Sequence, residues 1–148
     1  MKSLQMEDRN SNFDFKAVPF SDLPQIDSQK VMATLRHRIA VQKALDKIKG
    51  RIQDPPTLAE LASFSGLSRT YFSYVFKEVT GMKLQDYLVA ARLDKAKELL
   101  KHIDLKIKQI AHKGGFRDPN YFCRTFKKKI GESPTNWRLR SMIKERKY

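Results

Sequence analysis

The sequence predicts an all-α protein in which a pair of helices joined by a short turn occurs twice. Apolar residues recur at helical spacing from residue 31 onward, and Gly and Pro residues interrupt this spacing where helices of ordinary length would end. A pattern that begins at Thr57 returns about fifty residues later. We therefore expect about seven helices, arranged as two subdomains joined by a long linker helix.

The first 26 of the 148 residues predict no regular element. Their aromatic side chains are loosely spaced among polar ones, and Pro19 and Pro24 would each break a helix. We expect residues 1–26 to form a flexible arm or an interdomain linker. A helix should then begin at an N-cap, Asp27 or Ser28, and run to about Lys49. The predicted bipartite domain covers residues 27–148, with subdomains at 27–82 and 103–148 and the linker helix at 83–102.

Each copy of the repeat has the features of a helix-turn-helix unit. A short helix with an alanine on its apolar face is followed by Gly66 or Gly115, and glycine readily adopts the left-handed backbone that such a turn requires. An N-cap, Ser68 or Asp118, then begins a second helix, which ends at a further glycine. The stripes expected to be buried on the second helices are Phe72, Val75, Phe76 and Val79 in the first copy, and Phe122, Phe126 and Ile130 in the second.

Helix-start signals and one long helical segment complete the predicted domain. Thr57 and Glu60 have the spacing of a capping box, and Ser133 followed by Pro134 predicts the start of a final helix. Residues 84 to about 102 predict a single helix of roughly 27 Å, at ~1.5 Å per residue. Adjacent major grooves on one face of B-DNA are ~34 Å apart. A linker of this length could hold the two second helices near one turn of DNA apart.

Positive charge is concentrated in the last third of the chain. The 30 Lys and Arg residues against 16 Asp and Glu give a formal charge of +14. Residues 101–148 contain 14 basic and four acidic residues, a net charge of +10, whereas residues 1–30 have a net charge of −1. A concentrated excess of this kind is typical of a surface that binds a polyanion.

Composition excludes several other classes of protein. There is no run of eighteen apolar residues that could span a membrane, and the first thirty residues contain no apolar core of a secretory signal. Cys123 is the only cysteine, so the chain forms no internal disulfide and no thiolate zinc cluster, as expected of a cytoplasmic protein. With no phosphate-binding loop, metal-spaced His and Cys residues or catalytic triad, we expect neither an enzyme nor a bound cofactor or metal.

Several short strings recur in a fixed order between about Val31 and Arg138. They are Leu61-Ala62 with Gly66-Leu67-Ser68, Tyr71-Phe72 with Phe76-Lys77, the run from Arg92 to Leu100, Ile110-Ala111, Gly115-Phe116, Tyr121-Phe122, Phe126-Lys127, and Ser133-Pro134 with Trp137-Arg138. With these strings the sequence resembles the DNA-binding domain of the AraC/XylS family of bacterial transcription regulators. The resemblance implies that two helices enter successive major grooves of double-stranded DNA near a promoter, and that the protein activates transcription with RNA polymerase as a further partner. We expect the isolated domain to be a monomer.

Positions that can contact DNA follow from those expected to be buried. Arg124 is the candidate for base readout, because its guanidinium matches guanine O6 and N7, and Asn120 can pair with adenine in the same way. Arg124 as a phosphate clamp and Lys127–Lys129 as a merely solvated helix end remain alternatives. The predicted DNA-binding residues are Arg69, Thr70, Ser73, Tyr74 and Lys77 on the first recognition helix, and Pro119, Asn120, Cys123, Arg124, Lys127 and Lys128 on the second.

One alternative function and the roles of two further residues complete the predictions. The chain could be a helical protein-interaction module, such as an anti-activator, that does not read DNA. We expect Arg92, on the linker helix, to form a structural ion pair rather than a DNA contact. We interpret Cys123 as a small neutral contact residue rather than a redox sensor.

Overall fold

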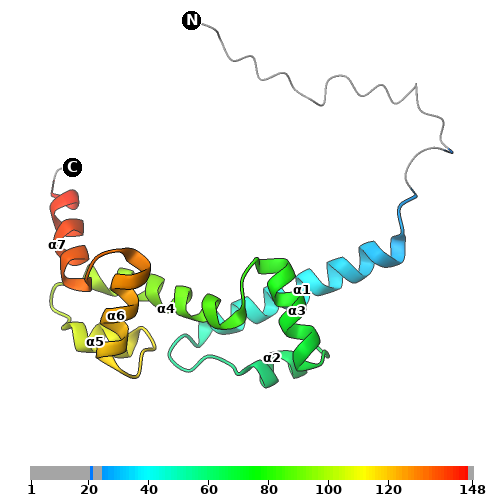
Figure 1. The fold of residues 1–148 in the computed structure, drawn as a ribbon, viewed down its shortest axis with the longest axis horizontal. Helices are drawn as coiled ribbons and strands as arrows, with labels where there is room; N and C mark the ends of the chain where they lie inside the picture. Colours follow the sequence, from blue (N-terminus) through cyan, green and yellow to red (C-terminus); the bar gives the residue numbers. More distant parts are fainter. Residues whose placement is uncertain (1–20, 22–24, 147–148) are drawn as a thin grey trace, which may run out of the picture. The chain divides into compact units, whose positions relative to one another are not determined.

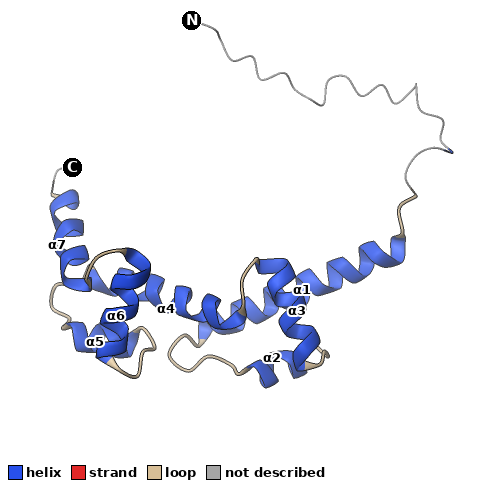
Figure 2. Cartoon of the chain, in the orientation of Figure 1, coloured by secondary structure: helices blue, strands red, loops and turns tan. Residues whose placement is uncertain are grey.

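The structure, a computed structural model of the chain, describes residue 21 and residues 25–146. Over these residues it contains seven α-helices and no strand, which confirms the all-α prediction (Figures 1 and 2). The predicted arm, residues 1–26, lies outside the described residues except for positions 21, 25 and 26. The helices are α1 (Ser28–Gly50), α2 (Leu58–Phe64), α3 (Arg69–Thr80), α4 (Leu84–Leu100), α5 (Ile107–Lys113), α6 (Pro119–Ile130) and α7 (Pro134–Glu145).

The chain divides into two units, one up to Ala33 and one from Thr34 onward. In the first unit, Asp27 is the N-cap of α1, as predicted. Its Oδ1 accepts hydrogen bonds from the backbone N–H groups of Gln29 and Lys30, at 3.0 and 3.2 Å. The second unit contains the predicted first subdomain from residue 34 onward, the linker helix and the predicted second subdomain.

Residues 34–146 have two hydrophobic cores, and α4 contributes to both. Leu84 and Leu88 at the start of α4 belong to the first core, and Leu93, Ala96 and Leu100 belong to the second. Figure 1 shows α4 between the helices that complete each core. The predicted linker helix is therefore a structural part of both subdomains. The other buried residues are Val41, Ala44, Ile48, Leu61, Ala62, Phe72, Val75 and Phe76 in the first core, and Ile110, Ala111, Phe116, Phe122 and Phe126 in the second.

The predicted turns form in both copies of the repeat. Gly66 and Gly115 have φ of +67° and +94°, the left-handed conformation that the turns were expected to need. The N-cap side chains also act as predicted, since Ser68 Oγ accepts from the Tyr71 N–H at 3.2 Å and Asp118 Oδ1 from the Asn120 N–H at 2.9 Å. Each such cap is worth about 1 kcal/mol of helix stability.

One expected core position is wrong. Val79 was predicted to continue the buried stripe of α3, but it is 39% exposed. It lies in the last turn of the helix, beyond the residues that α1 and α4 cover. The repeat itself contained the signal, because Val79 aligns with Lys129 in the second copy. Ile130, by contrast, packs against the second core as predicted.

In the second subdomain, α7 takes the place that the start of α4 takes in the first, since Trp137 lies fifty residues after Tyr87. Trp137 of α7 packs against the second core, and Arg138 beside it binds the end of α4. The Arg138 guanidinium donates to the carbonyl oxygens of Leu100 and Leu105, at 3.0 and 2.7 Å. These carbonyls lie at or beyond the helix end and would otherwise lack intrahelical partners. No helix in the part of the chain described here is long and apolar enough to cross a bilayer.

Candidate nucleic-acid interface

The first candidate surface is the outer face of α3. Phe72, Val75 and Phe76 are buried on its inner face, and the ring centroids of Phe72 and Phe76 lie 6.0 Å apart. Phe76 also meets Tyr87 of α4 edge-on, with 5.7 Å between ring centroids. These contacts fix the rotation of α3 about its own axis. As a result, the structure brings all five predicted residues of this helix to solvent: Arg69, Thr70, Ser73, Tyr74 and Lys77.

The second candidate surface is the outer face of α6. Phe122 lies between Phe116 and Phe126, tilted against the first ring and edge-on to the second, with ring centroids 5.0 and 5.7 Å away, and Phe126 meets Trp137 edge-on at 6.4 Å. This aromatic row holds the inner face of α6 against α5 and α7. Four of the six predicted residues are exposed: Asn120, Arg124, Lys127 and Lys128.

The other two predicted residues of α6 are less exposed than expected. Pro119 is half-buried because it is the first residue of α6 and lies next to the packed loop between α5 and α6. Cys123 is half-buried because its side chain packs against the second core beside Phe122. Burial also raises the pKa of the Cys123 thiol, which disfavours the reactive thiolate.

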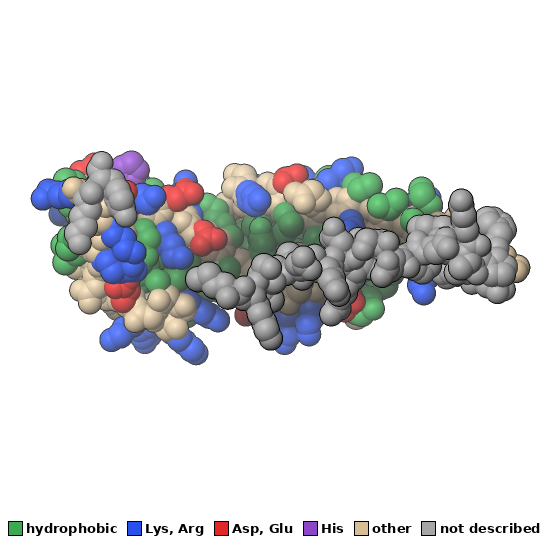
Figure 3. Space-filling model, turned by 90° about the horizontal axis from the view of Figure 1, so that it is seen from above, with side chains coloured by type: hydrophobic (Ala, Val, Ile, Leu, Met, Phe, Trp, Pro, Cys, Tyr) green, Lys and Arg blue, Asp and Glu red, His purple; other side chains and the backbone are tan. Residues whose placement is uncertain are grey.

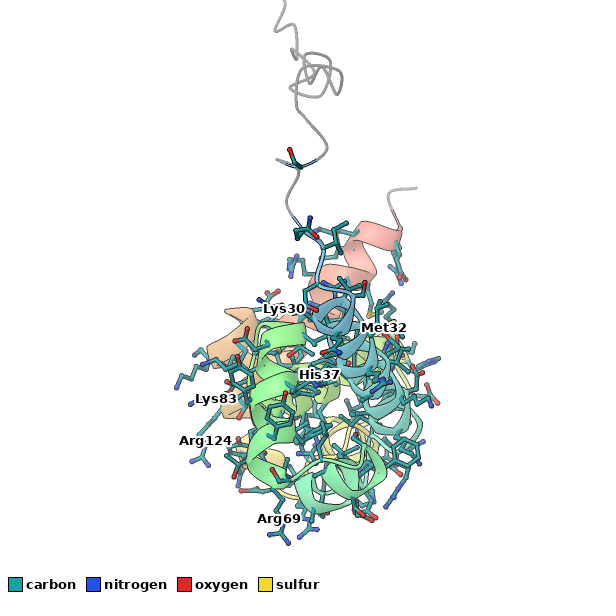
Figure 4. The ribbon with its side chains drawn as sticks, turned by 90° about the vertical axis from the view of Figure 1, so that its right-hand side faces the viewer. Lys30, Met32, His37, Arg69, Lys83 and Arg124 are labelled. Atoms are coloured by element: carbon teal, nitrogen blue, oxygen red, sulfur yellow. The ribbon has the colours of Figure 1, made fainter. Side chains whose placement is uncertain are left out.

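An aromatic pair on α3 extends toward α1, and sequence reasoning did not find this contact. Tyr71 and Tyr74 stack with ring centroids 6.1 Å apart, and both are exposed. The Tyr71 hydroxyl lies 3.4 Å from His37 Nε2, and the two rings meet edge-on at 5.5 Å. The spacing of the two tyrosines puts them on one helix face, but no local pattern links His37 to them. His37 therefore lies at the edge of the candidate surface (Figure 4).

The ion pair predicted for Arg92 is absent from the described part of the chain. Its Nε is buried without a hydrogen-bond partner, and burial lowers the pKa of the guanidinium. The side chain instead lies beside the turn before α6, with Arg117 and Tyr121 as its electrostatic neighbours. Acidic residues of α4 pair within their own helix, as in the contact between Lys97 and Asp94 at 4.0 Å.

Basic side chains project from both candidate surfaces. Arg69 of α3 and Arg124 of α6 point away from the helices into solvent at the lower left of Figure 4. Figure 3 shows Lys and Arg side chains around the second subdomain, at the left of that view. Three lysines, Lys127 to Lys129, occupy the last turn of α6, where positive charge also stabilises the helix dipole.

Two exposed recognition helices, each following a glycine turn on one shared unit, define a tandem helix-turn-helix domain. Residues 61–140 match the sequence model of a family described as "Helix-turn-helix domain". The chain belongs to this AraC-type helix-turn-helix family.

Curated relatives support the same placement. The chain is 35% identical over 109 residues to the HTH-type transcriptional regulator YijO of Escherichia coli (strain K12), a match that covers 74% of this chain and 38% of YijO. It is 33% identical over 109 residues to the HTH-type transcriptional activator RhaR of Klebsiella pneumoniae, with 74% of this chain and 39% of RhaR covered. The chain thus spans about two-fifths of the length of these relatives.

Solved structures share the fold. The C-terminal domain of the two-component response regulator yesN from Fusobacterium nucleatum is 34% identical, with a TM-score of 0.54 and coverage of 73% of this chain and 98% of that one. The DNA-binding domain of AdpA, solved in complex with a target DNA, gives a TM-score of 0.66 at 23% identity, over 71% of this chain and 95% of that one. The second likeness shows the fold alone.

Proposed function

We propose that this chain is a sequence-specific module of a bacterial transcription regulator that binds double-stranded DNA near a promoter. In this proposal, α3 and α6 enter two successive major grooves. The observation that carries it is the pair of exposed, polar and basic recognition helices on one unit, each packed into a core to which α4 contributes. A protein-interaction module has no need of two such faces with this repeated geometry.

The length of α4 supports simultaneous binding by both helices. Its 17 residues extend for about 26 Å at 1.5 Å per residue. Successive major grooves on one face of B-DNA are ~34 Å apart, and the recognition helices lie to either side of α4 in sequence. A single chain can then place two recognition helices on DNA as a dimer of single helix-turn-helix proteins does, so the isolated domain acts as a monomer.

The two recognition helices have different proposed tasks. On α6, Arg124 reads guanine, Asn120 reads adenine, and Lys127 and Lys128 bind phosphates. On α3, Thr70, Ser73 and Tyr74 make single hydrogen bonds or contact thymine methyl groups. Arg69 and Lys77, at opposite ends of that helix, bind the backbone of the same groove.

Activation of transcription is part of the proposal. The support is that several relatives are named as activators, RhaR among them. An activator bound beside a promoter would contact RNA polymerase and would act in the cytoplasm, where the chromosome lies.

The test is selection of duplexes from a random pool with the whole chain. We expect an enriched asymmetric site with two specified blocks, centred about one helical turn (10–10.5 bp) apart. The double variant Asn120→Ala/Arg124→Ala is the matched control and should retain only the block that α3 reads. If a folded wild-type protein enriches no sequence, the proposal fails and the protein-interaction alternative is favoured.

A further inference from the structure

The turn of the second helix-turn-helix unit lies directly against the first subdomain. A Cβ placed on Gly115 would lie 2.5 Å from the carbonyl oxygen of Ile52, which belongs to the loop between α1 and α2. It would also lie 3.1 Å from Nε of Arg92 on α4. Real Cβ atoms do not approach a backbone oxygen as closely as 2.5 Å, so only glycine fits between these groups. Backbone of one subdomain therefore touches backbone of the other.

The neighbouring glycine extends this contact along α4. A Cβ on Gly114 would lie 3.5 Å from the carbonyl oxygen of Arg92 and 3.1 Å from that of Ile110. Gly114 is itself buried. We call the contact formed by Ile52, Arg92, Gly114 and Gly115 the seam.

The corresponding turn in the first subdomain has no such contact. Gly66 has φ of +67°, close to the conformation of Gly115, but a Cβ on it would meet nothing within 4 Å. Its glycine is required by backbone conformation alone. At Gly115 the backbone conformation and the close approach both require glycine. The repeat thus supplies a matched control. An alanine at Gly66 would strain the backbone only, whereas an alanine at Gly115 would strain the backbone and also disrupt the contact.

The seam lies where it controls the position of α6. Gly115 is four residues before the first residue of α6, and Phe116 between them is in the second core. A single helix such as α4 could twist or bend between its two cores. A backbone contact outside its axis adds a second point of attachment, and two points restrict rotation of one subdomain about α4 against the other.

We propose that the seam fixes the distance and rotation between the two recognition helices, so that the protein selects operators by the spacing of their two half-sites. This inference rests on the proposed DNA-binding function. Insertion of one base pair moves a half-site by about 3.4 Å along the duplex and roughly 35° around it. A domain held at the seam cannot follow that change without breaking the contact between Gly115 and Ile52.

The first experiment uses the wild-type chain. Affinity is measured for the selected operator and for versions with one base pair added or removed between the blocks, each with a hydroxyl-radical footprint. We expect at least a tenfold loss on both altered operators, with protection of one block only. Unchanged affinity with both blocks protected at every spacing would overturn the inference and leave the proposed function intact. Failure to bind the selected operator itself would overturn the proposed function.

The second experiment compares Gly115→Ala with Gly66→Ala on the same operators. Both variants carry the cost of a left-handed alanine, and circular dichroism establishes that each is folded at the assay temperature. We expect Gly115→Ala to reduce the preference for the native spacing to less than threefold or to shift the best spacing, and Gly66→Ala to keep it. Equal spacing preference in both variants would contradict the role of the seam.

Arg92→Ala tests the seam if Gly115→Ala does not fold. It removes the side chain whose Nε lies beside Gly115 and leaves the sequence of the turn unchanged. We expect a folded protein with a several-fold smaller spacing preference and a footprint that covers both blocks on the altered operators. Retention of the full wild-type preference would contradict the proposal.

Discussion

The two subdomains use one pattern of helix, turn and recognition helix, and hold the recognition helix by the same aromatic contact, but they anchor the helix that follows by different means. In the first, Phe76 of α3 meets Tyr87 of the linker helix α4. In the second, the equivalent Phe126 meets Trp137 of α7, and Arg138 joins α7 to the end of α4 through carbonyl oxygens. Tyr87 and Trp137 lie fifty residues apart, so the aromatic contact belongs to the repeat, whereas the position of Arg138 is taken in the first copy by the buried Leu88.

The exposed faces differ as well. The face of α3 carries the stacked pair Tyr71 and Tyr74, with a single lysine near its end. The face of α6 carries Arg124 and ends in three consecutive lysines. We infer that the second subdomain supplies more of the phosphate binding, and that the first contributes fit to the groove through its aromatic and hydroxyl side chains.

The largest expected effect is on the two cores. Phe76→Ala and Phe126→Ala each remove a fully buried ring and should lower the free energy of unfolding by about 3–5 kcal/mol. Because α4 belongs to both cores, we expect either variant to unfold in one transition. Trp137, the single tryptophan, reports the second core, so its fluorescence in Phe76→Ala should follow the circular dichroism during urea unfolding. If the circular dichroism of Phe76→Ala changed at lower urea than in wild type while its fluorescence transition stayed at the wild-type urea concentration, the subdomains would unfold independently.

A smaller loss is expected for DNA binding by Arg124→Ala, at roughly 1–3 kcal/mol with relaxed preference at one base pair. Arg124→Lys keeps the charge but removes the planar fork that matches guanine. If Arg124 reads a base, the lysine variant should lose specificity as the alanine variant does. Equal losses on cognate and scrambled duplexes, with rescue by lysine, would make Arg124 a phosphate contact.

The lysines should affect salt dependence rather than specificity. Each phosphate contact contributes about 0.9 to the slope of log K against log salt. Lys127→Ala/Lys128→Ala should therefore reduce the slope by close to the contribution of two phosphate contacts. Lys77→Ala on α3 should reduce it by no more than the contribution of one. Titrations between 50 and 200 mM salt measure these slopes. A wild-type slope in the double variant would leave this run of lysines as a solvated helix end.

The smallest expected effect concerns the caps of the two short helices. Glu60 accepts a hydrogen bond from the Thr57 N–H at 2.7 Å, and bonds from the Thr57 backbone and side chain lower the Glu60 pKa below 4.5. A carboxyl group with a lowered folded-state pKa stabilises the fold above its unfolded pKa, and this contribution is lost as the pH falls through the folded value. In the second subdomain, Gln109 makes the equivalent bond to the Lys106 N–H at 2.9 Å and does not titrate.

Glu60→Gln should therefore make the first cap resemble the second. We expect the variant to be slightly less stable than wild type near pH 7, and the two proteins to converge as the pH falls below about 4.5, because wild type loses this contribution and the variant does not have it. Thermal unfolding across this pH range measures the difference. A pH dependence identical to wild type would show that the bond between Glu60 and Thr57 does not contribute.

Features set by nearby residues could be predicted from the sequence. The caps at Asp27, Ser68 and Asp118 and the left-handed turns at Gly66 and Gly115 depend on a few neighbours, and the structure contains each of them. The exposed face of α3 followed from the helical period alone.

Features that depend on distant contacts could not be predicted. The half-burial of Cys123 depends on how deeply the second core reaches along α6, and the lack of an ion pair at Arg92 depends on which turn packs over it. The contacts of His37 with Tyr71 and of Gly115 with Ile52 join segments with no shared local pattern. That these surfaces bind DNA remains a prediction for every residue named on α3 and α6.

The most direct test of the account is a hydroxyl-radical footprint of the whole chain on its selected duplex. We predict two protected tracts on one face of the DNA, centred about one helical turn (10–10.5 bp) apart. Arg69→Ala/Tyr74→Ala should weaken one tract, and Asn120→Ala/Arg124→Ala the other. A single protected tract, unaffected by one of these two double variants, would contradict the claim that both recognition helices occupy DNA at the same time.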